Sequence, residues 1–157
     1  MFILLVLLQV SLFNQINLFG IATPVVYIYF LIKLPVRLNR NVVLLLAALM
    51  GLAIDTFGYT LGLNMLIMVI SGFMRYWLLY LFTPRDITDN VVPSFSTFGR
   101  NIFLRYAGTA TLLHIILLNA IETGAFAVPH LLALRIAGSF ALSYMIIYGF
   151  EILCSEK

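Results

Sequence analysis

Hydrophobic residues form six long runs along the 157-residue chain, separated by short polar, glycine- or proline-containing stretches. The runs cover residues 2–19, 23–35, 41–57, 61–82, 102–121 and 131–153. A helix needs about 20 residues to cross a hydrocarbon layer of about 30 Å, so the last three runs are long enough to span a membrane. The first three are shorter or interrupted by polar residues, and their length alone leaves their role open.

Proline and capping residues predict where the second run starts and stops. Thr23 followed by Pro24 is a typical helix start, because threonine caps the free amide groups and proline is tolerated in the first turn. Pro35 disfavours helix in the residue before it, so we expect this helix to end at Leu34. The pattern therefore predicts a short helix over residues 23–35.

Basic residues alternate between the connections and predict the orientation of the chain. The connection after the second run and the connection after the fourth run, with the start of the fifth run, contain Lys33, Arg37, Arg40, Arg85, Arg100 and Arg105. The other three connections contain no lysine or arginine. Cytoplasmic loops are enriched in these residues, so the alternation predicts six transmembrane helices with both termini in the cytoplasm. It also argues that the short runs cross, because omitting one would break the alternation.

Composition restricts the class of protein. Hydrophobic residues make up 63% of the chain and charged residues 10%, and the mean hydropathy is +1.09. Soluble domains are about 45–50% apolar and about 25% charged, so we expect one all-α polytopic membrane domain over residues 1–157. The net charge of +3 then indicates membrane orientation, with no nucleic-acid partner. The single cysteine, Cys154, excludes a disulfide within the chain and a cysteine metal cluster.

Three ionisable residues are predicted to lie at one depth of the membrane. At 1.5 Å per residue, Asp55 lies about 21 Å from the cytoplasmic face, His114 about 18 Å from it, and Arg135 about 9 Å from the outer face. One hypothesis is a buried Asp55–Arg135 ion pair with His114 nearby, because a paired charge is tolerated where a single one is not. The alternative is that Arg135 extends to the surface and Asp55 caps the next helix. His114 is more typical of a hydrogen-bonded packing residue than of a ligand.

Other residues suggest anchoring and packing. Arg75 lies beside Tyr76, Trp77 and Tyr80, which are typical of an aromatic belt at the membrane surface, with a partner contact as the alternative. Glu151 falls at the depth of Arg105 and could pair with it. Small residues recur every four positions in two runs, a pattern that lets helix backbones approach closely. These positions are Ala47 and Gly51, followed by Asp55, and then Ala133, Ala137 and Ala141.

Motifs for catalysis are missing from the sequence. There is no G-x-S-x-G, H-E-x-x-H or phosphate-binding loop, and no pair of carboxylates close together on one predicted helix. We therefore expect a protein that is not an enzyme and has no cofactor and no metal site. A function in which the chain binds a partner or a small molecule fits the composition better.

Four stretches together resemble the bacterial rod shape-determining protein family MreD. They are "LQVSLFNQINLFGIATPVVYIYFLIKLP" (8–35), "GLAIDTFGYTLGLN" (51–64), "LFTPRD" (81–86) and "FLRYAGTATLLHIILLNAIE" (103–122). Their order and spacing carry the resemblance over nearly the whole chain. It implies a six-helix fold similar to the substrate-binding (S) components of energy-coupling-factor transporters. It also implies a location in the bacterial inner membrane.

The resemblance implies a scaffold in the machinery that elongates the cell wall. Its partners would be MreC, and indirectly a peptidoglycan polymerase–transpeptidase pair and the actin-like MreB; homo-oligomers are compatible with this role. Candidate contact residues are Asn14, Gln15 and Asn17 outside, and Arg37, Arg40, Arg75, Arg85 and Asp86 inside. The alternative is a vitamin-type transporter subunit that binds a small molecule. It would use an outward pocket with Asp55, Tyr59, Asn64, His114 and Arg135.

Overall fold

The computed structural model describes residues 2–13, 23–58, 60, 62–83, 91–122 and 129–155. In this part of the chain every regular element is a helix. The elements are α1 (Phe2–Leu8), the π-helical turn η1 (Gln9–Phe13), α2 (Ile28–Ile32), α3 (Arg40–Gly58), α4 (Leu63–Phe82), α5 (Phe95–Phe98), α6 (Arg100–Glu122) and α7 (Pro129–Ser155). The predicted all-α class is therefore confirmed.

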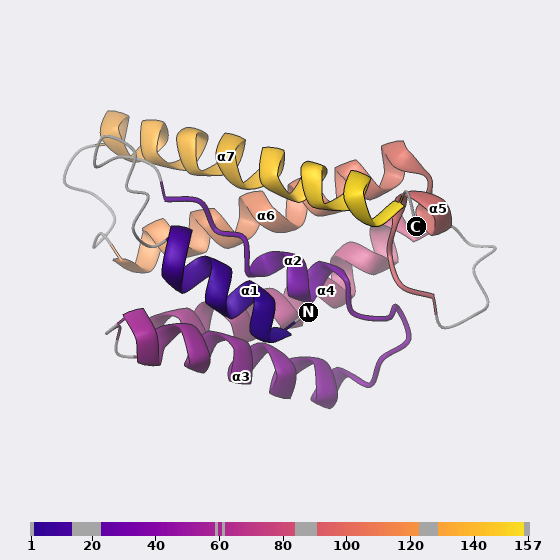
Figure 1. Cartoon of the computed structure of the whole chain (residues 1–157), viewed down its shortest axis with the longest axis horizontal. Helices are drawn as coiled ribbons and strands as arrows, with labels where there is room; N and C mark the ends of the chain where they lie inside the picture. The colour runs from indigo at the N-terminus through magenta and orange to yellow at the C-terminus, as the bar shows by residue number, and fades with distance from the viewer. Residues whose placement is uncertain are drawn as a thin grey trace.

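Four of these helices, α3, α4, α6 and α7, are long and apolar enough to cross a membrane. They form an elongated bundle in which α3 packs on α4, α4 on α6, and α6 on α7 (Figure 1). The chain is thus a multi-pass membrane protein by the length and composition of its helices. The six spans expected from the charge pattern are not confirmed: the first run is described only as far as Phe13, as α1 and η1, and the second run contains only the short helix α2.

The second run departs most from the sequence prediction. Residues 23–26 have no regular secondary structure, and the helix α2 begins only at Ile28 and ends at Ile32. The segment passes along the bundle from the end where α7 begins to the end where α3 begins (Figure 1). Its side chains are nearly all buried; they include Val25, Val26, Tyr27, Ile28, Tyr29, Leu31 and Ile32. The predicted helix over 23–35 is therefore corrected to a broken segment inside the protein.

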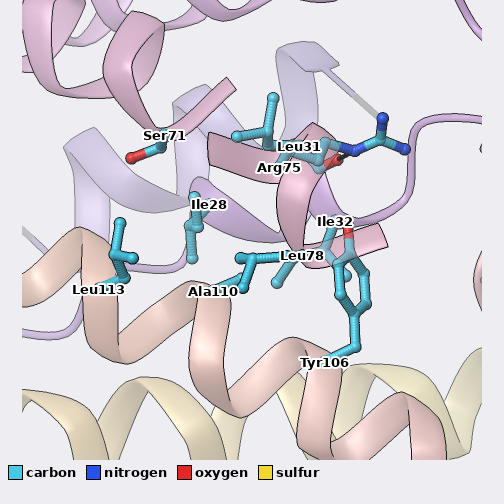
Figure 2. A pocket seen from close by; sticks show the side chains of 9 residues that line it. All are labelled: Ile28, Leu31, Ile32, Ser71, Arg75, Leu78, Tyr106, Ala110 and Leu113. Atoms are coloured by element: carbon cyan, nitrogen blue, oxygen red, sulfur yellow. Dashed lines mark hydrogen bonds between the residues drawn. The ribbon is translucent and has the colours of Figure 1, made fainter. Parts of the chain in front are cut away.

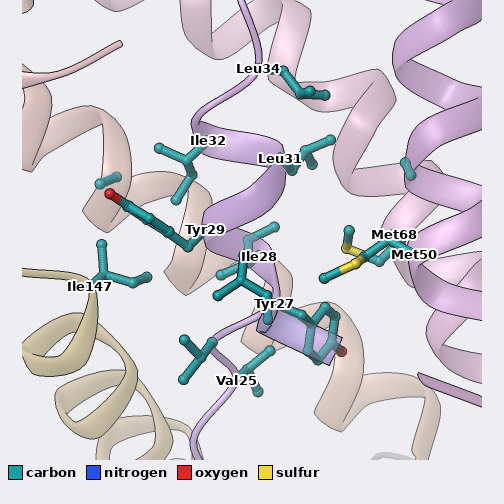
Figure 3. Close-up of a cluster of buried hydrophobic side chains, with 14 of the residues drawn as sticks. Val25, Tyr27, Ile28, Tyr29, Leu31, Ile32, Leu34, Met50, Met68 and Ile147 are labelled. Carbon is teal, nitrogen blue, oxygen red and sulfur yellow. The ribbon is translucent and has the colours of Figure 1, made fainter. Parts of the chain in front are cut away.

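This broken segment forms the centre of the hydrophobic core. Figure 3 shows side chains of α2 and its flanks between Met50 of α3, Met68 of α4 and Ile147 of α7. Because the segment is surrounded by the core, its side chains are apolar on all faces. An amphipathic surface helix would have one polar face. The core is thus built around a short interior segment that the four long helices surround.

Small residues set the distance between α3 and α4. Ala47 and Gly51 are buried, and a Cβ added at Gly51 would lie 2.4 Å from the Cα atom of Met65. The packing face predicted on α3 is therefore confirmed. The second predicted face differs, because Ala133, Ala137 and Ala141 of α7 are all exposed.

Candidate functional site

The carboxylate of Asp55 caps the start of α4. Asp55 is 5% exposed, and its Oδ1 accepts hydrogen bonds from the backbone amide of Asn64 (3.0 Å), the Asn64 side chain (3.0 Å) and the Thr60 hydroxyl. Its Oδ2 accepts one from the backbone amide of Met65 at 2.8 Å. The first amide groups of a helix have no partners within that helix, so this carboxylate satisfies two of them and complements the helix dipole.

The expected Asp55–Arg135 ion pair is not formed in the structure. The salt bridge found within the described part of the chain joins Lys33 to Glu151 instead. Asp55 belongs to α3 and Arg135 to α7, and these two helices lie on opposite sides of the bundle (Figure 1). Of the two alternatives, the structure therefore shows the helix cap, and Arg135 is partly exposed on α7.

A chain of hydrogen bonds leads from this cap into the core. The Tyr27 hydroxyl donates to Oδ1 of Asn64 at 2.8 Å and lies 3.1 Å from Nε2 of His114. Nδ1 of His114 lies 2.8 Å from the hydroxyl of Ser71. His114 is fully buried, and its ring also packs edge-on against Tyr27. Asp55 and His114 thus belong to one polar chain, whereas Arg135 does not join it among the described contacts.

The cap leads to a stability prediction for Asp55. Asp55→Ala should lower the free energy of unfolding by about 3 kcal/mol, because two backbone amides lose their acceptor. Asp55→Asn keeps one oxygen and should cost less. Thermal unfolding in detergent measures both variants, with Arg135→Gln as the control. If adding Arg135→Gln to Asp55→Asn restored the stability, an ion pair and not a cap would be the dominant role of Asp55.

Side chains from η1 and α7 form hydrogen bonds with the non-helical backbone of residues 23–26. The backbone amide of Val25 donates to the Ser143 hydroxyl at 2.8 Å, and that of Thr23 donates to the Ser139 hydroxyl at 3.2 Å. The side-chain amide of Gln9 both accepts and donates: its Oε1 accepts a hydrogen bond from the Val26 amide, and its Nε2 donates one to the Pro24 carbonyl. Non-helical backbone at membrane depth requires such partners, because lipid tails supply none and the hydrocarbon core contains no water.

Arg75 holds the other end of the broken segment. It is 4% exposed, and its Nε donates to the carbonyl of Leu31 at 2.9 Å. Its Nη2 donates to the carbonyls of Leu34 and Pro35. These are carbonyls at and after the end of α2, where the helix supplies no donors. The expectation that Arg75 reaches lipid head groups or a partner is therefore corrected, because its guanidinium is used inside the chain.

Glu151 makes a third group of buried polar contacts, besides those of Asp55 and Arg75. It lies at the end of the bundle where α3 begins. It is 1% exposed and forms a salt bridge to Lys33 at 2.8 Å. It also accepts hydrogen bonds from the Tyr29 hydroxyl at 2.8 Å and from the Phe95 amide at 3.1 Å. The suggested pairing of Glu151 with Arg105 is corrected, since Arg105 is exposed. Glu151 thus joins α2, the start of α5 and α7.

Sequence reasoning missed several residues that hold the segment. Ser139 and Ser143 are four residues apart, so they lie on one face of α7, and this spacing was a readable signal. Gln9 and Ser71 carry no comparable signal, because a single polar residue in an apolar run does not indicate its partner. The candidates Asn14, Gln15, Asn17, Tyr59, Arg85 and Asp86 lie outside the described residues.

A small cavity adjoins these polar groups. It lies between α2, α4 and α6, below Ser71 and Arg75, with Tyr106 and apolar side chains around it (Figure 2). Its volume of about 10 Å³ is enough for about one water molecule. Such a space cannot hold a vitamin-sized ligand. The polar side chains around Asp55, Arg75 and Glu151 therefore form hydrogen bonds mainly with one another and with the protein backbone.

These contacts connect the helices to one another and to the broken segment. Asp55, Gln9, Arg75 and Glu151 are each hydrogen-bonded to a backbone group. In the described part of the chain, the buried hydroxyl groups of Tyr106, Thr111 and Thr83 have no hydrogen-bond partner. No group of three or more metal-ligating residues occurs among the described residues. No protein-family model matches the chain, and no curated protein and no solved structure matches it significantly.

Proposed function

We propose that this chain is a non-enzymatic membrane subunit of the bacterial cell-wall elongation machinery, located in the inner membrane. In this role it binds MreC and supports peptidoglycan synthesis. The ordered resemblance of four sequence stretches to the MreD family suggests the role. The all-helical, multi-pass structure is compatible with it.

One observation carries the preference for a scaffold over a small-molecule carrier. Asp55, Asn64 and His114, which a carrier would turn toward its ligand, are hydrogen-bonded to helix α4 and to one another through Tyr27. A ligand would have to displace these bonds, and a buried polar group without a partner costs about 1–3 kcal/mol. A chain of polar side chains that are already hydrogen-bonded to one another suits a rigid protein that binds other proteins on its outer surface.

The outer face of α7 is the surface that fits a partner helix best. Ala133, Ala137 and Ala141 are exposed along one stripe, and α7 runs along one edge of the bundle (Figure 1). Small residues allow close approach of a second helix within a membrane. We propose that the transmembrane helix of MreC packs on this stripe.

The partner surface can be tested with a matched pair of substitutions. Ala137→Leu should reduce the amount of MreC that co-purifies with the protein by about tenfold, because the added bulk separates the two helices. Ala120→Leu is the control, since Ala120 is also exposed but belongs to α6. Equal co-purification of MreC with both variants would contradict the proposed surface.

The proposed role itself is tested by native mass spectrometry of the protein purified together with its bound partners. A complex with MreC and without a small molecule would support the scaffold. A vitamin-like ligand bound at one molecule per chain would instead overturn it and favour the carrier.

A further inference from the structure

A groove of about 300 Å³ lies between α3 and α4 at the end of the bundle where α3 begins. Its lining comes from the loop before α3, the first turns of α3 and the second half of α4. The lining residues are Val36, Arg37, Leu38, Arg40, Val43, Gly72, Arg75, Tyr76 and Leu79. The groove is open, and it is far larger than the cavity beneath Ser71.

The described lining of the groove is basic. Three of its nine residues are arginines, and none of these nine is acidic. Arg37 and Arg40 are exposed at its rim, and Arg75 is fixed at its base by its bonds to the end of α2. The guanidinium of Arg40 also stacks over the ring of Phe73 at 4.0 Å, which holds it beside α4. Because arginine forms paired hydrogen bonds with phosphate, this arrangement favours a phosphate-bearing ligand.

The rest of the groove is suited to lipid. Its other lining residues are mainly apolar, and the aromatic side chains of Tyr76, Trp77 and Tyr80 are 62–83% exposed on the same stretch of α4. Aromatic residues of this kind gather at the level of the head groups. The positive-inside rule assigns this end of the bundle to the cytoplasmic leaflet, which carries the anionic lipids.

We propose that this groove binds an anionic phospholipid of the cytoplasmic leaflet. Its phosphate lies between Arg37 and Arg40, and its acyl chain follows the apolar side chains of α3 and α4. A free phosphate would use only the arginines, whereas a lipid also uses the apolar wall and the aromatic rim. The observed combination of both surfaces therefore favours the lipid.

Native mass spectrometry tests the proposal, with the full chain in mixed phosphatidylglycerol and phosphatidylcholine. The unmodified protein should retain phosphatidylglycerol in preference to phosphatidylcholine. The double variant Arg37→Gln/Arg40→Gln should bind phosphatidylglycerol about 25-fold more weakly, since each surface arginine contributes about fivefold. Arg105→Gln is the matched control, because Arg105 is an exposed arginine near the same end, on α6. It should bind like the unmodified protein.

Three outcomes would overturn the proposal. The first is equal retention of the two lipids by the unmodified protein, and the second is equal loss in the Arg105 variant and the double variant. The third is displacement of phosphatidylglycerol by millimolar inorganic phosphate, which would assign the site to a free anion. Because Arg37 and Arg40 are exposed, thermal unfolding should show the double variant to be folded, and Arg37→Lys/Arg40→Lys should recover part of the binding.

Discussion

Replacing Glu151 by alanine should lower the free energy of unfolding by about 3–5 kcal/mol, which is among the largest single effects in this protein. The substitution removes the acceptor of Lys33, the Tyr29 hydroxyl and the Phe95 amide at once. Lys33 is only 12% exposed, so its charge would remain partly buried without a counter-ion. Thermal or denaturant unfolding in detergent measures the loss.

Two further variants separate the charge of Glu151 from its packing. Glu151→Gln keeps an acceptor for Tyr29 and should lose less stability than alanine. Lys33→Met combined with Glu151→Met removes both charges and should recover much of the loss, because a buried pair replaced by apolar residues is often neutral. A double variant no more stable than Glu151→Ala would contradict this explanation.

The long helices could be predicted from the sequence because their apolar runs match the thickness of a membrane. The predicted runs 41–57, 61–82, 102–121 and 131–153 correspond to α3, α4, α6 and α7 with differences of a few residues at the ends. Length and hydropathy are enough for such elements, since a helix satisfies its own backbone within lipid.

The broken segment could not be predicted in the same way. A short apolar run is compatible with a buried helix or with a buried extended stretch, and hydrophobic periodicity does not distinguish them. Residues 23–26 can remain non-helical because Ser139, Ser143 and Gln9, which are distant in sequence, supply hydrogen-bond partners for their backbone. The capping signal of Thr23 and Pro24 was therefore overridden by tertiary contacts.

The candidate site could also be predicted only in part from the sequence. The count of helical rise grouped Asp55 with His114, and hydrogen bonds through Asn64 and Tyr27 connect these two residues in the structure. It could not indicate which side of the bundle each helix faces, so Arg135 was assigned to the wrong group. Arg75 was mistaken for a surface residue because its acceptors are backbone carbonyls at and after the end of α2, which leave no trace in the pattern of side chains.

The second large effect is expected at Gly51. Gly51→Ala should lower the free energy of unfolding by about 3 kcal/mol, at the upper end of the usual effect of overpacking. The added Cβ would lie 2.4 Å from Cα and 2.6 Å from the amide nitrogen of Met65, and backbone atoms cannot rotate away. Helix α4 would have to shift at its first turn, where Asp55 accepts its amide hydrogen bonds. The glycine thus allows the approach of the two helices on which the cap depends.

Gly149→Ala is the matched control for this prediction. Gly149 is also a helical glycine, in α7, but a Cβ there would meet no atom within 4 Å. Alanine should therefore be neutral or stabilise the helix by up to about 1 kcal/mol. Combining Gly51→Ala with Asp55→Ala should cost less than the sum of the two single losses, because the first substitution already disturbs the cap. If the two losses were strictly additive, the close approach at Gly51 would serve packing alone and not the cap.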